Sequence, residues 1–221
     1  TCAKHHWAWM MKHVFDELEF DSKLMVDEMF FMEEDYVVSP TIYETVTQGL
    51  YLANKNPNYF GVVLDITDGG VHREREGNDW QEITFRTGPM AIGRKTWQKI
   101  VNAKDEFCNH DEYNWDWSVV WLANKGLIPY KVLAPFIPQV QHIGLDGMHV
   151  NNEKATTQAG KLDKARLQKA AANWHIPQSF HGTGIVHVGE ARKPAAEKPN
   201  GGFGHPQDHE HCLKILGPTW L

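Results

Sequence analysis

The chain has 221 residues, of which 42% are hydrophobic and nine are tryptophan, so it can bury one sizeable core and is not a disordered polypeptide. Its formal net charge is −6 and its basic residues form no stripe, which argues against nucleic-acid binding. No apolar run approaches the ~18–20 residues that a membrane-spanning helix needs, and no signal peptide is visible.

Helical and extended patterns alternate along the chain. Trp7, Met11 and Leu18 recur at helical spacing, and Pro40 follows Ser39 as at a helix start. The predicted helices are 4–20, 40–54, 94–103, one capped by Asp111, 161–173 and one starting at Asp208. The predicted strands are 24–32, 59–66, 83–85, 130–134 and 185–188, with a polar loop at 68–78. This alternation predicts an α/β sheet with helices on both faces.

The run from Phe107 to Trp117 combines acidic and aromatic residues. Trp115 and Trp117 flank Asp116, and indole rings beside a carboxylate suit the apolar faces and hydroxyls of a sugar. The alternative is an ordinary helix start, with Asp116 exposed and Trp117 in the core.

Two further clusters suggest a metal site. An apolar run at 29–32 ends in Glu33, Glu34 and Asp35, as a buried strand would end in carboxylates that attract a divalent cation. His142 follows a second apolar strand and is a candidate ligand beside Asp35. The alternatives are a solvated acidic loop and a histidine that is simply hydrogen-bonded.

The end of the chain allows a different metal site. His205, His209, His211 and Cys212 have spacings that zinc sites use. A helix cap at Asp208 and a paired Cys212 explain the same residues more simply. Three cysteines alone do not distinguish a reduced protein from one with a disulfide.

Several motifs occur together in a fixed order. They are Lys-His-His-Trp at 4–7, Glu-Glu-Asp at 33–35, Phe-Cys-x-x-Asp-x-Tyr-Asn-Trp-Asp-Trp at 107–117, Lys-Val-Leu-x-Pro at 131–135, His-x-Gly-x-x-Gly-Met-His at 142–149, Asn-Gly-Gly-Phe-Gly at 200–204 and Asp-His-Glu-x-Cys at 208–212. In combination they resemble the N-acetylglucosaminyltransferase II family of N-glycan synthesis. The resemblance runs from Lys4 to Cys212, with poor matches at 57–93 and 150–195.

The resemblance implies a GT-A nucleotide-sugar transferase fold whose N-terminal part is missing. It implies one partial catalytic domain over 1–221, with the metal and catalytic core at about 1–150 and a variable segment at about 151–221. Because the chain begins without methionine, we expect a fragment. The resemblance implies that the parent is a type II membrane protein of the Golgi, with the anchor outside this sequence.

The resemblance also implies chemical roles. Asp116 stands where the family places its general base, and Asp35 and His142 stand where it holds Mn²⁺. Cys108 and Cys212 match a pair that is disulfide-linked in the family.

Substrate contacts are implied in the same way. Lys4, His5 and His6 fall in the segment that touches the UDP-GlcNAc donor. Tyr113 and Trp115 fall where contacts to the N-glycan acceptor are expected.

The implied activity is inverting transfer of N-acetylglucosamine in β1,2 linkage to the α1,6-arm mannose of an N-glycan core, in the Golgi lumen. The chain departs from the family pattern at Phe85–Pro89, which lacks the usual His-Asn of the acceptor side. The alternatives are a non-catalytic or degenerate glycan-binding homologue and a metal-dependent hydrolase.

Overall fold

The structure is a computed structural model that describes residues 2–18, 27–64, 79–86, 88–142, 179–187, 191, 193–194 and 198–217. The predicted loop at 68–78, the predicted helix at 161–173 and the motif residues 143–149 lie outside the described residues, as does the side chain of Cys2.

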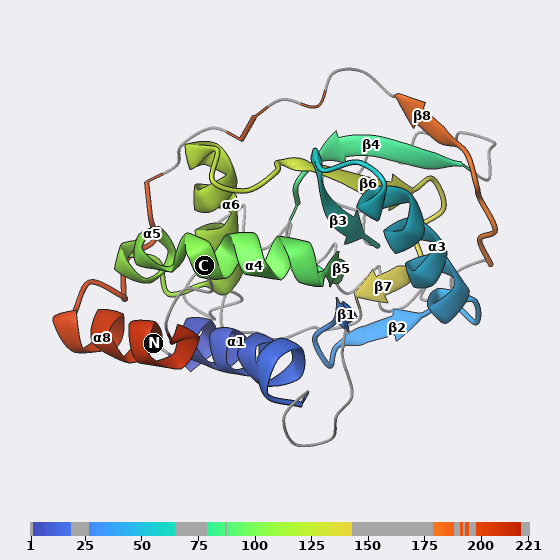
Figure 1. Ribbon diagram of the computed structural model, residues 1–221. Coiled ribbons are helices and arrows are strands. Elements are labelled where there is room, and N and C mark those ends of the chain that lie inside the picture. Colours follow the sequence, from blue (N-terminus) through green and yellow to red (C-terminus); the bar gives the residue numbers. More distant parts are fainter. Residues whose placement is uncertain are drawn as a thin grey trace, which may run out of the picture.

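A six-stranded mixed sheet forms the centre of the described part of the chain (Figure 1). Its strands, in spatial order, are β1 (Glu28–Phe31), β5 (Met90–Gly93), β3 (Tyr59–Val63), β6 (Lys131–Pro135), β4 (Trp80–Thr84) and β8 (Ile185–His187). The β3–β6 and β4–β8 pairs are parallel and the other three pairs are antiparallel. A separate antiparallel ribbon pairs β2 (Tyr36–Val38) with β7 (Val140–His142).

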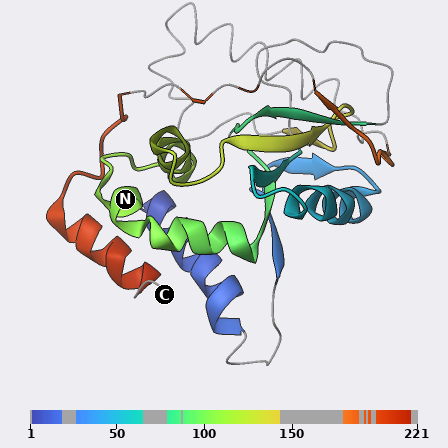
Figure 2. The same cartoon turned by 45° about the horizontal axis from the view of Figure 1, so that its top comes forward.

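Helices cover both faces of the sheet. They are α1 (Cys2–Lys12), which continues as the π-helical η1 (His13–Glu17), α3 (Ile42–Asn54), α4 (Arg94–Asn102), α5 (Lys104–Asn109), α6 (Trp115–Lys125) and α8 (Pro206–Leu216). Figure 1 and Figure 2 both show α1 and α8, from the two ends of the described chain, side by side.

Strand alternation divides the core into two clusters. Val62, Ala91 and Leu133 are register partners that face one side, where they pack with Leu50 and Ala53 of α3. Their strand neighbours face the other side and pack with the remaining helices. Gly49 allows α3 to approach closely, because a Cβ there would collide with the indole of Trp80.

The predicted α/β sheet with helices on both faces is confirmed, with corrections at its boundaries. Strand β4 begins at Trp80 rather than Ile83 and lies inside the sheet, because it pairs with β6 on one side and with β8 on the other. The buried Trp80 indole donates a hydrogen bond to the Gly182 carbonyl at 2.8 Å. Helix α8 begins at Pro206 with His205 as its N-cap, not at Asp208.

Helix α3 also starts later than expected. Its N-cap is Thr41. Ser39 precedes the helix, where its hydroxyl accepts from the backbone N–H of Thr41 at 3.2 Å and donates to Gln139. None of the described helices has the length and apolar character needed to cross a membrane.

Candidate functional site

The predicted catalytic residue Asp116 lies in the first turn of α6. The carboxylate is partly buried, and Oδ1 accepts a hydrogen bond from the backbone N–H of Trp117 at 2.8 Å. The unpaired N–H groups at a helix start favour a negative charge there. Asp116 therefore lies at the electropositive end of α6 and is not fully buried.

The tryptophans beside Asp116 differ from expectation. Trp115 is buried and stacks on Trp7, with ring centroids 5.0 Å apart, whereas Trp117 is 37% exposed. The expectation that Trp117 is in the core and that Asp111 caps the helix was therefore wrong. The N-cap is Asn114, and this start directs a stripe toward the core that consists of Trp115, Ser118, Val119, Leu122 and Ala123.

Two acids of the same run are structural. Glu112 is 1% exposed and accepts hydrogen bonds from the backbone and side-chain nitrogens of Asn114 and of Asn200. Asp111 Oδ1 accepts from the backbone N–H of Phe203 at 2.8 Å. These bonds hold the segment 200–204 against the start of α6. The sequence did not predict this contact. Asn114 before an apolar stripe was the available signal for the cap.

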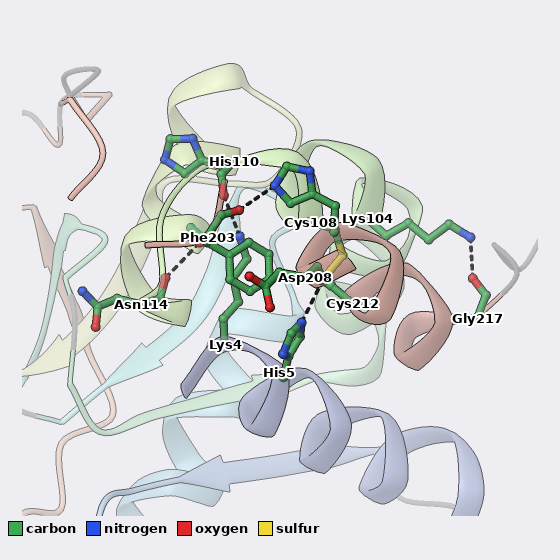
Figure 3. Close-up of a disulfide and its surroundings, with 12 residues drawn as sticks. Lys4, His5, Lys104, Cys108, His110, Asn114, Phe203, Asp208, Cys212 and Gly217 are labelled. Atoms are coloured by element: carbon green, nitrogen blue, oxygen red, sulfur yellow. Dashed lines mark hydrogen bonds between the residues drawn. A yellow bond between two sulfur atoms is a disulfide. The ribbon is translucent and has the colours of Figure 1, made fainter. Parts of the chain in front are cut away.

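Lys4 is buried, although the sequence predicted a donor contact there. Its ammonium donates to the His110 carbonyl at 3.0 Å and lies 4.2 Å from the centre of the Phe203 ring (Figure 3). Burial lowers the pKa of Lys4 to about 7, although the carboxylates of Glu112 and Asp111 raise it. The donor role of Lys4 stays a prediction.

The two histidines after Lys4 are more accessible. His5 Nε2 donates to the Asp208 carbonyl at 2.9 Å, and its ring lies 4.7 Å from that of His211. Burial lowers the pKa of His5, and the neighbouring His211 contributes to the decrease. His6 is exposed and lies over Trp9. The donor-binding prediction for both residues is untested, as is the acceptor role of Tyr113, which is partly buried.

Cys108 and Cys212 form the expected disulfide. Their Cα atoms are 5.6 Å apart and they are separated by 104 residues, so the bond joins α5 to α8 (Figure 3). A cysteine in a disulfide cannot be a thiolate ligand, which removes Cys212 from the alternative zinc site. His209 of that set instead donates to the Phe203 carbonyl.

The predicted metal residues lie at one end of the β2–β7 ribbon. Tyr36 pairs with His142, and Asp35 directly precedes Tyr36, so the two residues are neighbours in the register. A carboxylate oxygen and an imidazole nitrogen are ligands that Mn²⁺ accepts. In the part of the chain described, no three His, Cys, Asp or Glu side chains converge as a complete metal cluster. Because the side chain of His142 is outside the described set, the ligand distance stays a prediction.

Aromatic packing connects the two parts of the site. Phe31, at the end of β1, packs edge-on against the ring of Trp115 at 5.0 Å. Asp35 follows Phe31 by four residues and Asp116 follows Trp115 directly. The segment that carries the predicted base and the segment that carries the predicted metal ligand are therefore joined by the contact between Trp115 and Phe31.

The other end of the ribbon is fixed by neutral polar groups. Ser39 N–H donates to the Gln139 carbonyl at 2.9 Å, and Ser39 Oγ donates to Gln139 Oε1 at 2.6 Å. Thr45 Oγ1 donates to the same side-chain oxygen at 3.3 Å, and all three residues are buried. The ribbon is thus tied to the first turns of α3.

One cavity lies between α5, the loop after it and α6, and it is not the candidate site. It has a volume of about 220 Å³ and is lined by Asp105, Glu106, Asn109, His110, Asp111 and Trp121. It contains none of the residues predicted to bind donor, acceptor or metal.

Comparison with known proteins gives consistent relatives. The alpha-1,6-mannosyl-glycoprotein 2-beta-N-acetylglucosaminyltransferases of Sus scrofa and Homo sapiens are 28% and 26% identical to the chain, and each alignment covers 95% of the chain and 47% of the relative. The Arabidopsis thaliana protein of the same name is 29% identical, over 95% of the chain and 49% of the relative. The chain therefore spans about half the length of the curated relatives it matches.

The family comparison covers almost the whole sequence. The model of the family described as N-acetylglucosaminyltransferase II (MGAT2) matches residues 1–212. That range includes the start of α6, the ribbon and both disulfide cysteines. The chain belongs to the N-acetylglucosaminyltransferase II family.

Proposed function

We propose that the complete protein is an inverting glycosyltransferase with a GT-A fold. It moves N-acetylglucosamine from UDP-GlcNAc to the 2-hydroxyl of the α1,6-arm mannose of an N-glycan, in β1,2 linkage. The family match and the names of the relatives support the donor sugar and the acceptor. The observation that carries the mechanism is the placement of Asp116 at the start of α6, beside an exposed indole and next to the strand that leads to Asp35.

In this proposal Asp116 acts as the general base. Its carboxylate takes the proton of the mannose 2-hydroxyl while that oxygen bonds to the anomeric carbon, and the bond from that carbon to UDP breaks on the opposite face. The configuration inverts in one step, so a single base is sufficient and no enzyme nucleophile is required.

Asp35 and His142 are the residues that would hold Mn²⁺. Their oxygen and nitrogen donors and their adjacent register fit such an ion. A bound divalent ion would supply Lewis-acid stabilisation of the diphosphate leaving group.

The disulfide supports a location in the Golgi lumen. Disulfides persist in the oxidising secretory compartments and are rare in the cytosol. The Cys108–Cys212 bond joins two helices of the buried core and therefore belongs to the folded state.

The test is an assay of the complete protein with UDP-GlcNAc and a trimmed N-glycan. Asp116→Asn keeps the shape of the side chain but removes the proton acceptor, and we expect the transfer rate to fall by about 10²–10⁴-fold. Donor binding, measured by calorimetry, should be nearly unchanged.

Glu106→Gln is the matched control, because Glu106 is an exposed acid of α5 that pairs only loosely with Lys125 at 3.9 Å. It should transfer at the wild-type rate. A wild-type rate in Asp116→Asn would exclude Asp116 as the base, and glycan binding without any turnover in the unmodified protein would identify a glycan-binding homologue.

A further inference from the structure

The buried carboxylate of Glu112 lies between two segments that are distant in the sequence. Oε1 accepts from the backbone and side-chain nitrogens of Asn114, both at 3.0 Å. Oε2 accepts from the same two groups of Asn200, both at 2.9 Å. A carboxylate has about four acceptor sites, so these four donors use its full capacity.

The two hydrogen bonds to Oε1 come from the residue at the start of α6. Asn114 is the N-cap residue, but its side chain makes no capping hydrogen bond to the helix. Its side-chain amide is directed to Glu112, while its carbonyl accepts from the N–H and the hydroxyl of Ser118 at 3.3 and 2.9 Å. The orientation of Asn114, two residues before Asp116, is therefore set by Glu112.

The two hydrogen bonds to Oε2 come from the first residue of the segment 200–204. Gly201 forms a bridge with Glu112, and the N–H of Gly201 donates to the Asp111 carbonyl at 3.0 Å. Gly201 and Gly202 both have φ near +80°, a conformation that other residues rarely adopt. The segment is thus closely fitted to the loop before α6, and its Phe203 ring covers Lys4.

We propose that Glu112 is a positioning residue for Asp116: it fixes the start of α6 against the segment 200–204 and so holds the carboxylate of Asp116 in its reactive orientation. The proposal rests on the proposed role of Asp116 as the base. None of the groups that Glu112 accepts from belongs to a predicted donor or metal site, so its effect should fall on the chemical step.

The first test is Glu112→Gln in the complete protein. The amide nitrogen of Gln is a donor, so it must face the donors of either Asn114 or Asn200. A small displacement of a catalytic group typically costs up to about 10²-fold, so we expect kcat to fall roughly 10–100-fold. The KM for UDP-GlcNAc should stay within about two-fold of wild type, because binding that is equal in the ground and transition states is unaffected.

Asp105→Asn is the matched control. Asp105 is an exposed acid of α5, the helix before this loop, and its substitution removes the same charge while leaving the contacts of Glu112 in place. Its kcat should be near wild type. An equal loss of kcat in both variants would show that charge near this loop, and not the contacts of Glu112, is responsible.

The decisive measurement is the double variant. In an Asp116→Asn background there is no base to position, so Glu112→Gln should reduce the residual rate little further. A purely structural role would lower the residual rate by the same factor as in the wild type, and that result would overturn the proposal.

Asn200→Ala provides a second route if Glu112→Gln does not fold. It removes one of the two donors to Oε2 from a position 88 residues away from Glu112. We expect a smaller loss of kcat that again disappears in the Asp116→Asn background.

The outcomes separate this inference from the proposed function. If Asp116→Asn abolishes transfer while Glu112→Gln and Asn200→Ala leave kcat unchanged, Glu112 does not position the base and the proposed function stands. If Asp116→Asn transfers at the wild-type rate, the proposed mechanism fails and the positioning role fails with it.

Discussion

The two halves of the candidate site are held by different kinds of interaction. The base side, which comprises the loop 110–114 and the first turn of α6, is fixed by the carboxylates of Asp111 and Glu112, by the buried Lys4 and by a disulfide in the preceding helix. The metal side, which comprises Asp35 and the β2–β7 ribbon, is fixed by backbone pairing and by the neutral groups around Gln139.

The difference corresponds to what each half would do in the proposed mechanism. A general base depends on its orientation toward a hydroxyl and receives no help from a permanently bound ligand, so the protein alone must hold it. Ligands of a metal are drawn together by the ion itself, so a backbone ribbon is a sufficient support. Three experiments test this contrast, in order of decreasing effect.

The largest effect should come from the aromatic support of the base side. Trp115→Ala removes a buried indole that stacks on Trp7, and we expect the free energy of unfolding to fall by about 3–5 kcal/mol. Trp117→Ala should cost less than about 1 kcal/mol, because that side chain is 37% exposed. Urea unfolding of the two variants measures both values, and similar values would contradict the observed burial.

On the metal side, the expected effect is on ion binding and not on the fold. Asp35→Ala should weaken Mn²⁺ binding by at least about 10–100-fold, which is the cost of losing even an indirect partner of a metal ligand. Titration with Mn²⁺ alone and with Mn²⁺ plus UDP gives the affinity.

Glu44→Gln, an exposed acid of α3, is the control for Asp35→Ala and should bind Mn²⁺ normally. Unchanged affinity in Asp35→Ala would exclude Asp35 as a ligand.

The smallest effect concerns the pH dependence of the base side. The pKa of Lys4 is lowered to about 7 in the fold, mainly by burial, from its ordinary value of 10.5. The unfolded chain therefore binds more protons across that range, and the contribution of Lys4 to the free energy of unfolding rises with pH. Lys4→Met removes this contribution. Between pH 7 and pH 9, wild type should gain roughly 2 kcal/mol relative to the variant.

Lys95→Met provides the comparison for Lys4, because Lys95 is an exposed lysine of α4. The difference in free energy of unfolding between Lys95→Met and wild type should not change with pH. A constant difference for Lys4→Met as well would show that Lys4 keeps its charge throughout the range.

Much of the fold was predictable because its signals are local. The helix at 94–103 was expected from its sequence, and α4 ends one residue earlier; the buried strand near 59–66 became β3. The boundaries of β4 and α8 were harder to predict from the sequence. The start of β4 involves the hydrogen bond from the buried Trp80 indole to the Gly182 carbonyl, and the start of α8 involves His205 as the N-cap before Pro206.

The site was predictable in part. Motifs predicted Asp116 as the base and Asp35 and His142 as metal ligands, and these roles stay predictions. The ribbon register brings Asp35 and His142 together along the backbone. The tryptophans were ambiguous, because Trp115 and Trp117 begin two different apolar stripes and only the cap at Asn114 decides between them. The role of Glu112 could not be foreseen, because its second partner is 88 residues away.

The link between Glu112 and Asn200 also has a consequence for biosynthesis. Ribosomes add roughly 5–20 residues per second, so the 88 residues that separate these positions take on the order of ten seconds to make. During that interval α6 can form, but its first turn lacks the segment that holds it in place. Under the proposed mechanism, a nascent chain would carry the carboxylate of Asp116 without the contacts that orient it, and competence for transfer would arise only after residues 200–204 had left the ribosome and docked.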